Sequence, residues 1–335
     1  MIAILGTRGI PNNHGGFEQF AEYLTIYMEK LGIQCYVYST HNHPYKEDNY
    51  KGVKIVHKYN PEVLLGTFGQ FLYDLFCIID IRKRNPKIVL QLGYTSSSIW
   101  NWIIPKKIKI FTNMDGLEWK RSKYNNLTKS FLLFAEKLAI KKSDYLISDS
   151  LGIQKYIEEK YTKKSFYIAY GANIFNTPDI RILNNILLKD YNLEPFNYDL
   201  IIARIEPENN ILMIIKSFIK SNSSRKMVIV GKKNTKFYNY IKMYETDQII
   251  FIDAIYDINI LNNLRYFSEL YFHGHSVGGT NPSLLEAMAS SALIIAHDNI
   301  FNKSILKDNA FYFNNETKLV NLIKSIKKKN YNSLI

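Results

Sequence analysis

The sequence predicts an α/β fold made of two doubly wound, Rossmann-like domains. Short apolar runs rich in branched side chains alternate with segments of helical period along the whole chain, and such alternation indicates βαβ units whose parallel sheet is covered on both faces. A length of 335 residues is too great for one typical domain core and suits two. Residues 173–197 contain Pro178 and Pro195 and no clear strand, so they are predicted to connect the two domains.

The first domain, residues 1–172, contains five predicted strands of four or five residues each. They are Ile2–Leu5, Gln34–Tyr38, Ile88–Leu92, Ile108–Phe111 and Tyr145–Ser148. Its first helix is predicted from an apolar stripe at i, i+3, i+4 and i+7 spacing, which runs from Phe17 to Leu31 and which Gly32 closes.

The second domain, residues 198–335, repeats the alternation with five more predicted strands. They are Leu200–Ile205, Met227–Val230, Ile249–Ile252, Leu270–Phe272 and Leu293–Ala296. Ligands of doubly wound domains bind outside the carboxyl ends of the parallel strands, so two such domains in tandem are expected to face a shared cleft.

Composition narrows the classes of function. With 47% hydrophobic and 22% charged residues, the chain is not disordered, collagen-like or a coiled coil. Its net charge is +13, and residues 1–172 hold 24 of the 43 basic residues against 15 of the 30 acidic ones. A basic first domain is expected to bind an anionic partner. The three candidates are a phosphorylated ligand, an acidic membrane surface and nucleic acid. Cys35 and Cys77 lack paired spacing, so buried reduced thiols are predicted rather than a disulfide framework or a zinc site.

No targeting or membrane-spanning segment is expected. The chain reaches Gly6 after one short apolar run, and its longest apolar stretch, Val63–Ile81, is interrupted by Gln70 and Asp74. We therefore expect a cytoplasmic protein that at most lies on a membrane surface.

A glycine-rich loop follows the first predicted strand. It contains Gly6, Gly9, Gly15 and Gly16. Glycines let the backbone approach a ligand closely, and the helix that follows offers free N–H groups and the positive end of its dipole. The alternative is a tight strand-to-helix turn, although about two to six residues would suffice for that. The spacing matches neither the dinucleotide fingerprint nor a Walker loop.

A second loop-to-helix motif follows the strand that ends near Phe272. Its helix is predicted to begin at Pro282, because proline after a capping residue is a helix start signal. Backbone amides at this helix start are expected to point outward, where they suit a diphosphate. They belong to Gly279, Thr280, Asn281 and Ser283. Glu286 lies about one turn further along, so its carboxylate is predicted to accept hydrogen bonds from sugar hydroxyls; the alternative is an ordinary acid on the helix surface.

Arg204 lies where another predicted strand runs into a helix, in the segment Ile202–Ile211. A guanidinium at a strand end can bind two phosphate oxygens at once. The alternative is a surface arginine paired with Glu206 or Glu208.

Together these motifs resemble a known family. Arg204 at a strand end, with the run Gly-Gly-Thr-Asn-Pro-Ser-Leu-Leu-Glu-Ala-Met from Gly278 onward, is similar to the donor site of GT-B glycosyltransferases of family 4. The opening Gly-Thr-Arg-Gly-Ile-Pro, the later Gly-Gly-Phe-Glu and the segment Asn113–Arg121 resemble the bacterial capsule and O-antigen rhamnosyltransferase-like subgroup. The resemblance covers residues 2 to about 315.

This resemblance implies roles for both domains. In the family the second domain binds a nucleotide-sugar, the first binds the acceptor, and neither a metal nor another cofactor is required. Arg204 would hold the donor diphosphate and Glu286 the ribose. Gly15 and Gly16 would approach the donor phosphate from the first domain. Arg204, Glu286 and Asp115 are the expected catalytic residues.

The chain departs from the family pattern at three positions. Asn209 replaces a lysine five residues after the arginine, Gly278 replaces the first glutamate of a pair, and Met114 replaces a histidine. His273 and His275 are candidates for the polar contacts of the missing glutamate, with local packing as the alternative. We expect Asn209 and His275 to line the donor site.

Acidic and aromatic residues follow the predicted strand Ile108–Phe111 and form the expected acceptor site. Asp115 and Glu118 can hydrogen-bond sugar hydroxyls. Trp119 can stack on a sugar ring, and Arg121 adds positive charge. The alternative is a solvated loop of mixed charge.

Basic clusters in the first domain predict contact with an anionic membrane. They are Arg82–Arg84, Lys106–Lys107, Lys109, Lys120–Lys123 and Lys141–Lys142. Each basic residue near an anionic surface contributes roughly 1 kcal/mol of attraction, so together they would hold the protein on the inner leaflet, near a lipid-linked acceptor. The alternative is solubilising charge.

The sequence thus predicts a retaining glycosyltransferase on the inner membrane face. The best-fitting reaction moves rhamnose from dTDP-rhamnose onto a lipid-diphosphate-linked saccharide for a capsule or O-antigen. Two alternatives stay open, a nucleotide-sugar epimerase on the same fold and a basic, non-catalytic nucleic-acid-binding protein. We expect no nucleic-acid partner, because no helix-turn-helix, zinc or RNA-binding motif is present.

Overall fold

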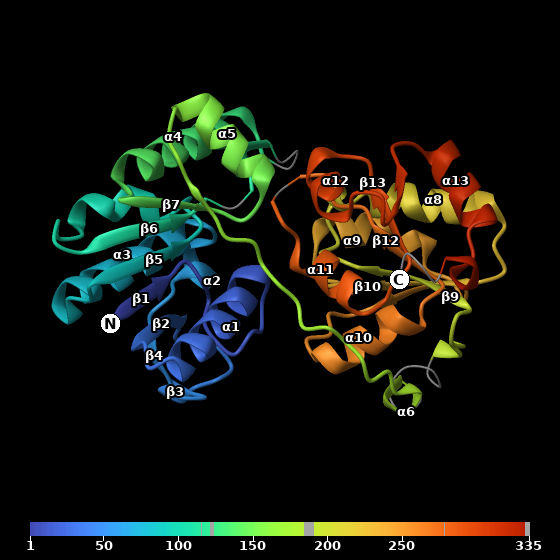
Figure 1. The fold of residues 1–335 in the computed structure, drawn as a ribbon, viewed down its shortest axis with the longest axis horizontal. Helices are drawn as coiled ribbons and strands as arrows, with labels where there is room; N and C mark the ends of the chain where they lie inside the picture. Colours follow the sequence, from blue (N-terminus) through green and yellow to red (C-terminus); the bar gives the residue numbers. More distant parts are fainter. Residues whose placement is uncertain (115, 121–123, 184–190, 278, 332–335) are drawn as a thin grey trace. The chain divides into compact units, whose positions relative to one another are not determined.

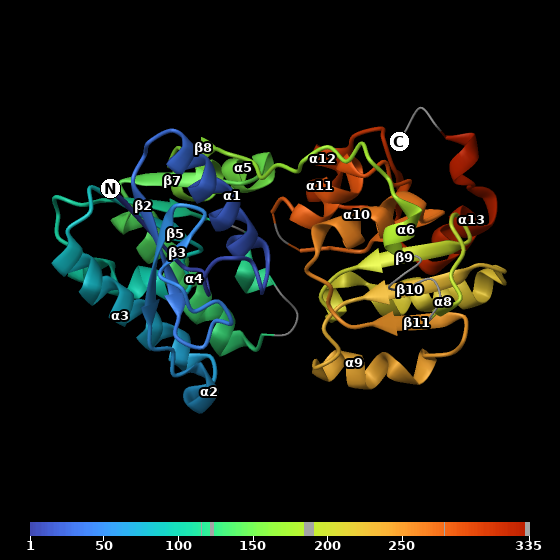
Figure 2. The ribbon, with the colours of Figure 1, turned by 90° about the horizontal axis from the view of Figure 1, so that it is seen from below.

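A computed structural model describes residues 1–114, 116–120, 124–183, 191–277 and 279–331. These residues form two compact units, one made of residues 1–120 and 124–169 and one that starts at Tyr170 (Figures 1 and 2). Each unit contains one sheet with its own hydrophobic clusters.

The first unit is built on an eight-stranded sheet with the order β3-β4-β2-β1-β5-β6-β7-β8. Neighbouring strands are parallel, except that β3 runs antiparallel to β4. The strands are β1 (Ile2–Leu5), β2 (Cys35–Thr40), β3 (Asn49–Tyr50), β4 (Val53–Lys58), β5 (Ile88–Leu92), β6 (Lys109–Asn113), β7 (Tyr145–Ser148) and β8 (Phe166–Tyr167). The helices are α1 (Gly16–Lys30), α2 (Glu62–Leu65), α3 (Phe68–Arg84), η1 (Ser97–Ile103), η2 (Glu118–Lys120), α4 (Asn126–Lys142) and α5 (Leu151–Tyr161).

Helices cover both faces of this sheet because successive side chains of a strand point to opposite faces. Leu5 of β1 packs in one cluster with Cys77 of α3. Ile4 points to the other face and packs in a second cluster with Ala21 of α1. Cys35 and Cys77 are buried free thiols, as predicted.

The second unit is built on a six-stranded, fully parallel sheet with the order β11-β10-β9-β12-β13-β14. The strands are β9 (Tyr198–Ile202), β10 (Lys226–Val230), β11 (Ile249–Ile252), β12 (Leu270–His273), β13 (Ile294–His297) and β14 (Phe311–Phe313). The helices are α6 (Ile180–Leu183), η4 (Pro207–Asn209), α8 (Ile211–Ser221), α9 (Lys236–Ile241), η5 (Lys242–Tyr244), α10 (Ile258–Phe267), α11 (Pro282–Ala289), α12 (Ile300–Leu306), α13 (Glu316–Ser325) and η6 (Lys328–Asn330).

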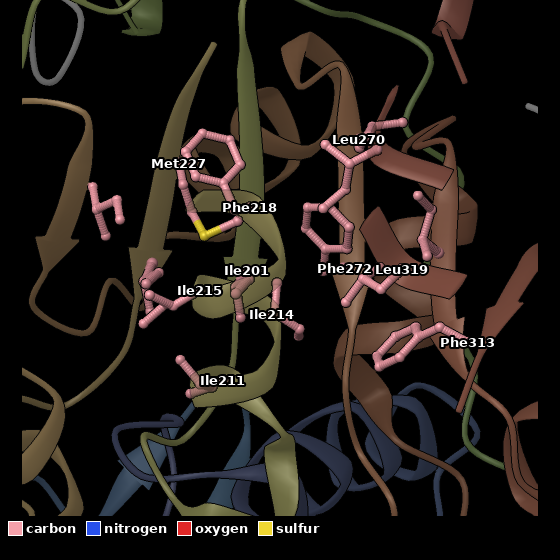
Figure 3. Close-up of a cluster of buried hydrophobic side chains, with 14 of the residues drawn as sticks. Ile201, Ile211, Ile214, Ile215, Phe218, Met227, Leu270, Phe272, Phe313 and Leu319 are labelled. Atoms are coloured by element: carbon pink, nitrogen blue, oxygen red, sulfur yellow. The ribbon is translucent and has the colours of Figure 1, made fainter. Parts of the chain in front are cut away.

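Buried clusters again occupy both faces of the second sheet. Leu200 packs with Leu264 of α10 on one face. On the other face Ile201 packs with Ile214 and Phe218 of α8, a cluster that Figure 3 shows in close-up. The architecture is therefore the predicted pair of doubly wound α/β units.

Every predicted strand is present, with one shift that matters for the site. The strand predicted as Leu200–Ile205 is β9, which ends at Ile202, so Arg204 lies in the following loop rather than on the strand. β3, β4, β8 and β14 are not predicted from the sequence. β3, β8 and β14 have only two or three residues each, and lysines and a histidine interrupt the apolar residues of β4.

Candidate functional site

The donor-site candidates of the second unit follow two neighbouring strands. Leu200 of β9 pairs with Tyr271 of β12, so the loops after these strands leave the same edge of the sheet. Arg204 is exposed in the first of these loops. Among the described residues its guanidinium forms neither a hydrogen bond nor the alternative ion pair with Glu206 or Glu208.

These two loops are fastened to each other by Asn209. Its Nδ2 donates to the carbonyl oxygen of Arg204 at 2.7 Å, and its Oδ1 lies 2.9 Å from Nδ1 of His275. Gly274 packs so closely that a Cβ there would stand 2.0 Å from the Asn209 carbonyl oxygen. The structure therefore brings together the two segments on which the predicted donor site depends. Asn209 and His275 serve this link; their contact with a donor stays a prediction.

Further hydrogen bonds hold the loop before α11 from both sides. The amide and hydroxyl of Ser276 donate to the Glu208 carbonyl oxygen at 3.0 and 2.8 Å. The carbonyl oxygen of His275 accepts from Asn299 at 2.9 Å and from Asn302 at 3.0 Å. Both faces of the loop are thus attached to fixed elements, which pre-organises it.

At the start of α11, one of the backbone amides that were expected to face a ligand is already hydrogen-bonded within the helix cap. Oδ1 of Asn281 accepts a hydrogen bond from the Ser283 amide at 2.9 Å, as an N-cap residue does. Pro282 has no N–H group. The expectation that the Ser283 amide points outward is therefore wrong, and the predicted diphosphate contacts are confined to the buried Gly279 and Thr280 and to Asn281 itself.

Glu286 belongs to a buried ion pair. Oε2 of Glu286 accepts from Nη2 of Arg265 on α10, which also donates to Oγ of Ser283 at 3.1 Å. Nη1 of Arg265 donates to Asn262 at 3.0 Å. Arg265 is fully buried and Glu286 is 8% exposed, so Glu286 is not an ordinary surface acid. Its role toward the ribose stays a prediction, with one carboxylate oxygen held by Arg265.

Arg265 is not among the residues predicted for the site, although the sequence contains a signal for it. Arg265 lies four residues after Leu261 and next to Leu264, both buried on the inner side of α10. A charged residue at an inward position of an amphipathic helix requires a buried partner. Its Nε has no hydrogen-bond partner among the described residues.

His273 is the other buried polar group near this loop. It ends β12, and its ring centroid lies 5.9 Å from that of His275. Burial lowers the pKa of His273 to about 3, so the imidazole is neutral near pH 7. Its Nε2 has no hydrogen-bond partner among the described residues, so it can donate to or accept from a ligand but cannot act as a cation.

In the first unit the glycine-rich loop takes a backbone path that requires glycine at two positions. Gly6 and Gly9 have φ of +88° and +128°. A Cβ there would stand 2.2 Å from a carbonyl oxygen of β5 and 2.0 Å from a hydroxyl of β2. Gly15 is the N-cap of α1 and Gly16 its first residue; their approach to a donor phosphate stays a prediction.

Two carboxylates of α1 hold this loop in place. Oε1 of Glu18 accepts from the amide of Arg8 at 2.8 Å, and Oε2 of Glu22 accepts from the amide of Asn12 at 2.8 Å. Burial raises the pKa of Glu18, although the Arg8 amide and guanidinium favour its charged form. Two backbone N–H groups of this loop are therefore hydrogen-bonded within the first unit.

The acceptor-site candidates are only partly visible. Asp115 and Arg121 lie outside the described residues. Glu118 and Trp119 are half-buried in η2, after β6. Nζ of Lys160 lies 5.2 Å from the centre of a Trp119 ring, a distance at which a cation attracts an aromatic face.

A buried carboxylate anchors the group around Trp119. Glu136 of α4 is 1% exposed. It accepts hydrogen bonds from Tyr94 at 3.3 Å, Tyr156 at 2.7 Å, Lys160 at 3.1 Å and also from Tyr161. No sequence motif indicates this cluster, because its members come from four separate segments.

Two kinds of feature are missing from the part of the chain that the structure describes. It contains no group of three or more His, Cys, Asp or Glu side chains placed to hold a metal ion. It also contains no helix that is both long and apolar enough to pass through a bilayer.

Two known families match the chain, and the boundary between their matches lies close to the boundary between the two structural units. Residues 1–173 match the family described as DUF1972, a domain of unknown function. Residues 189–334 match the family described as glycosyl transferases group 1. No curated protein matches the chain.

Solved structures with the same fold cover nearly the whole chain. Sucrose-phosphate synthase from Thermosynechococcus elongatus is 14% identical with a TM-score of 0.80, over 99% of this chain and 90% of that one. HepE from Anabaena in complex with UDP is 13% identical with a TM-score of 0.70, over 99% and 91%. α,α-Trehalose 6-phosphate synthase from Burkholderia multivorans is 9% identical with a TM-score of 0.71, over 100% and 92%.

Sequence identities this low show only that the fold is shared. The family matches show which families the two units belong to. The first unit carries the DUF1972 domain and the second carries the group 1 glycosyl transferase domain. The chain belongs to the DUF1972 family, and with its group 1 domain it is a glycosyltransferase of the GT-B fold.

Proposed function

We propose that this glycosyltransferase is a retaining enzyme that moves a sugar from a nucleoside diphosphate to a lipid-diphosphate-linked saccharide. The best-fitting donor is dTDP-rhamnose, and the product is a surface polysaccharide such as a capsule or O-antigen. The choice of rhamnose rests on the resemblance of residues 6–18 and 113–121 to rhamnosyltransferase-like enzymes. HepE, which shares the fold, holds UDP, and this supports a nucleoside diphosphate donor without deciding its base.

The observation that carries the donor assignment is the link between the Arg204 loop and the loop that precedes α11. Asn209 attaches both segments, and the guanidinium of Arg204 stays exposed beside them. We propose that this guanidinium and the amides at the helix start bind the diphosphate. Negative charge grows on the diphosphate as the glycosidic bond breaks, so groups that meet this charge favour the transition state over the bound donor. We assign no nucleophilic side chain.

On the acceptor side we propose that Glu118 and Trp119, with Asp115 and Arg121, bind the saccharide. The half-buried Trp119 has Lys160 over its ring at 5.2 Å, and this contact helps to position the ring before an acceptor binds. We further propose that transfer requires no metal or other cofactor and takes place at the cytoplasmic face of the membrane, where the basic first unit meets anionic lipid.

The test is a transfer assay with dTDP-, UDP- and GDP-sugars and a lipid-diphosphate acceptor, with and without EDTA. We expect release of a nucleoside diphosphate from one donor, unchanged by EDTA. Arg204→Ala should lower kcat/KM by about 100-fold, the usual loss when one group that stabilises developing charge is removed.

The matched control is Arg181→Ala, since Arg181 is an exposed arginine of the same unit that pairs with Asp179 at 2.8 Å. We expect this variant to keep the rate of the unmodified enzyme. Equal rates for Arg204→Ala and the unmodified enzyme, or no release from any donor, would contradict the proposal. Epimerised donor in the absence of acceptor would indicate the epimerase instead.

A further inference from the structure

A solvent-facing apolar corner joins α2 to α3 in the first unit. Val63, Leu64, Leu65 and Phe68 are between 48% and 83% exposed. No residue of α2 is buried, and Figure 2 shows this helix protruding at the lower end of the first unit. Large aliphatic and aromatic side chains normally lie inside a protein, and several together on a surface mark a contact site.

The apolar region continues onto α4. The ring of Phe68 stacks on Phe71 with centroids 6.2 Å apart, and Phe71 contacts Phe131 of α4 at 5.6 Å. Leu127 and Phe134 lie four residues before and three after Phe131, on the same side of the helix, and both are exposed. Six exposed side chains thus form one apolar surface: Val63, Leu64, Leu65, Phe68, Leu127 and Phe134.

The apolar surface begins at the edge of the unit that carries the acceptor candidates. The α2–α3 corner follows β4, and α4 begins after η2, which follows β6. β4 and β6 belong to the parallel part of one sheet, so their carboxyl ends meet at one edge. Glu118 and Trp119 lie at this same edge.

Glu62, the acid next to Val63 on α2, pairs with Arg8 at 2.7 Å, and basic residues dominate the segment that contains the apolar surface. Residues 62–142, which include it, contain 14 Lys and Arg but six Asp and Glu. Two of these acids, Asp74 and Glu136, are buried. Lys137 and Lys141 are exposed and continue the side of α4 that carries Phe134. An apolar region flanked by exposed lysines is complementary to a lipid surface with anionic headgroups.

We propose that the apolar surface is where this enzyme docks on an anionic lipid bilayer. Its apolar side chains enter the interfacial layer, and Lys137 and Lys141 meet the headgroups. This inference rests on the proposed lipid-linked acceptor and adds an apolar anchor, beside the acceptor edge, to the basic clusters of the sequence. A second copy of the chain is a poorer occupant, because a symmetric contact would bring two copies of the same lysine-flanked face together.

The experiment measures binding of the full chain to vesicles of phosphatidylcholine with and without phosphatidylglycerol, by co-sedimentation. We expect binding to the anionic vesicles only. The double variant Leu64→Asp/Phe68→Asp should lower the partition constant on the order of tenfold or more, because two apolar groups that enter the interface become charged. Both positions are exposed, so neither change opens a cavity in the core, although Phe68→Asp removes the ring contact with Phe71.

Matched controls come from the second unit. Met243 is 75% exposed in η5, and Met243→Asp should bind as the unmodified protein does. Lys137→Glu/Lys141→Glu should lose binding to anionic vesicles, whereas Lys324→Glu, an exposed lysine of α13, should keep most of it. Equal binding by the Leu64/Phe68 variant and the Met243 variant would overturn the proposal. A dimer in solution that Leu64→Asp separates would also overturn it, in favour of a second copy as the occupant.

Transfer to a water-soluble acceptor separates this inference from the proposed function. The Leu64→Asp/Phe68→Asp enzyme should keep kcat/KM toward such an acceptor and lose rate only when the acceptor is embedded in vesicles. If the unmodified enzyme transfers no sugar to either acceptor, the proposed function fails whether or not the vesicles bind. If transfer to the soluble acceptor proceeds and the vesicles are not bound, the docking proposal alone fails.

Discussion

At Glu286 the proposed donor site depends on Arg265, a charge 21 positions earlier in the chain. Arg265 has no exposed surface, and it connects Glu286 to Ser283 and to Asn262. The carboxylate is therefore held in one orientation before any ligand binds, which lowers the entropy lost when a ribose is bound.

Arg265→Met should destabilise the protein by about 3–5 kcal/mol, because it leaves the Glu286 carboxylate buried without its partner. Arg265→Met/Glu286→Leu should recover much of that loss and still fail to bind a nucleotide. Urea unfolding measures the first effect and a nucleotide thermal-shift assay the second. If the single variant is as stable as the unmodified protein, the pair does not carry the role assigned to it.

Asp74 gives the first unit a stability that depends on pH. Burial raises the pKa of this α3 carboxyl to about 7, although the hydroxyl of Ser96 donates to it at 2.5 Å. The unfolded value is 3.8, so the folded state binds the proton more tightly. The contribution of Asp74 to the free energy of unfolding is therefore complete below about pH 4 and is lost as the pH rises through about 7.

Asp74→Asn should remove this dependence, so that the melting temperature of the variant falls less than that of the unmodified protein between pH 4 and pH 7. Melting curves across this range make the comparison. Asp308→Asn, at an exposed aspartate of the second unit, is the control. Parallel curves for Asp74→Asn and the unmodified protein would contradict the assignment.

At the scale of elements, the proposed donor site depends on how two loops pack rather than on either loop alone. Gly274 lies against the backbone of Asn209, and Asn210 donates to its carbonyl oxygen at 2.7 Å. A side chain at Gly274 would push the Arg204 loop away from the loop that precedes α11.

Gly274→Ala should therefore destabilise the protein by about 1–3 kcal/mol, as overpacking of a close contact does, and raise KM for the donor. Gly171→Ala is the matched control, because a Cβ there meets no atom within 4 Å. Chemical denaturation and donor kinetics on both variants test this. Unchanged KM in Gly274→Ala would show that the link between the loops is not needed for donor binding.

At the scale of the whole molecule, the proposed donor groups of the second unit and the proposed acceptor groups of the first lie in separately packed units. A nucleoside diphosphate that binds only the folded second unit should raise the melting temperature of that unit by mass action. At a ligand concentration one thousand times Kd, the added free energy of unfolding is about 4 kcal/mol.

We expect dTDP to give the largest shift in a panel with UDP and GDP, and Arg204→Ala to remove it. Differential scanning calorimetry of the full chain is the measurement, with Arg181→Ala as the control. A larger shift with UDP or GDP would change the predicted base. The absence of a shift with all three would argue against the assigned donor site.

Local patterns made most of the fold predictable. Ile2–Leu5, Ile88–Leu92, Tyr145–Ser148 and Ile249–Ile252 have the predicted ends, because a buried parallel strand is a short, continuous apolar run. The start of α11 at Pro282 was also predicted correctly from neighbouring residues, because proline after a capping residue favours the first helical position. Edge strands such as β8 were not, because two residues are too few to show the alternation or the apolar run of a strand.

What the sequence determined by itself is therefore the two α/β units, the glycosyltransferase class and the motifs around Arg204 and Glu286, since each is encoded within a few consecutive residues. The tertiary structure alone decided which groups those motifs touch. Arg265 beside Glu286 and His275 beside Asn209 join residues 21 and 66 positions apart. The physical reason is that burial and pairing of a polar side chain depend on which distant elements pack around it, and no local period or spacing specifies that.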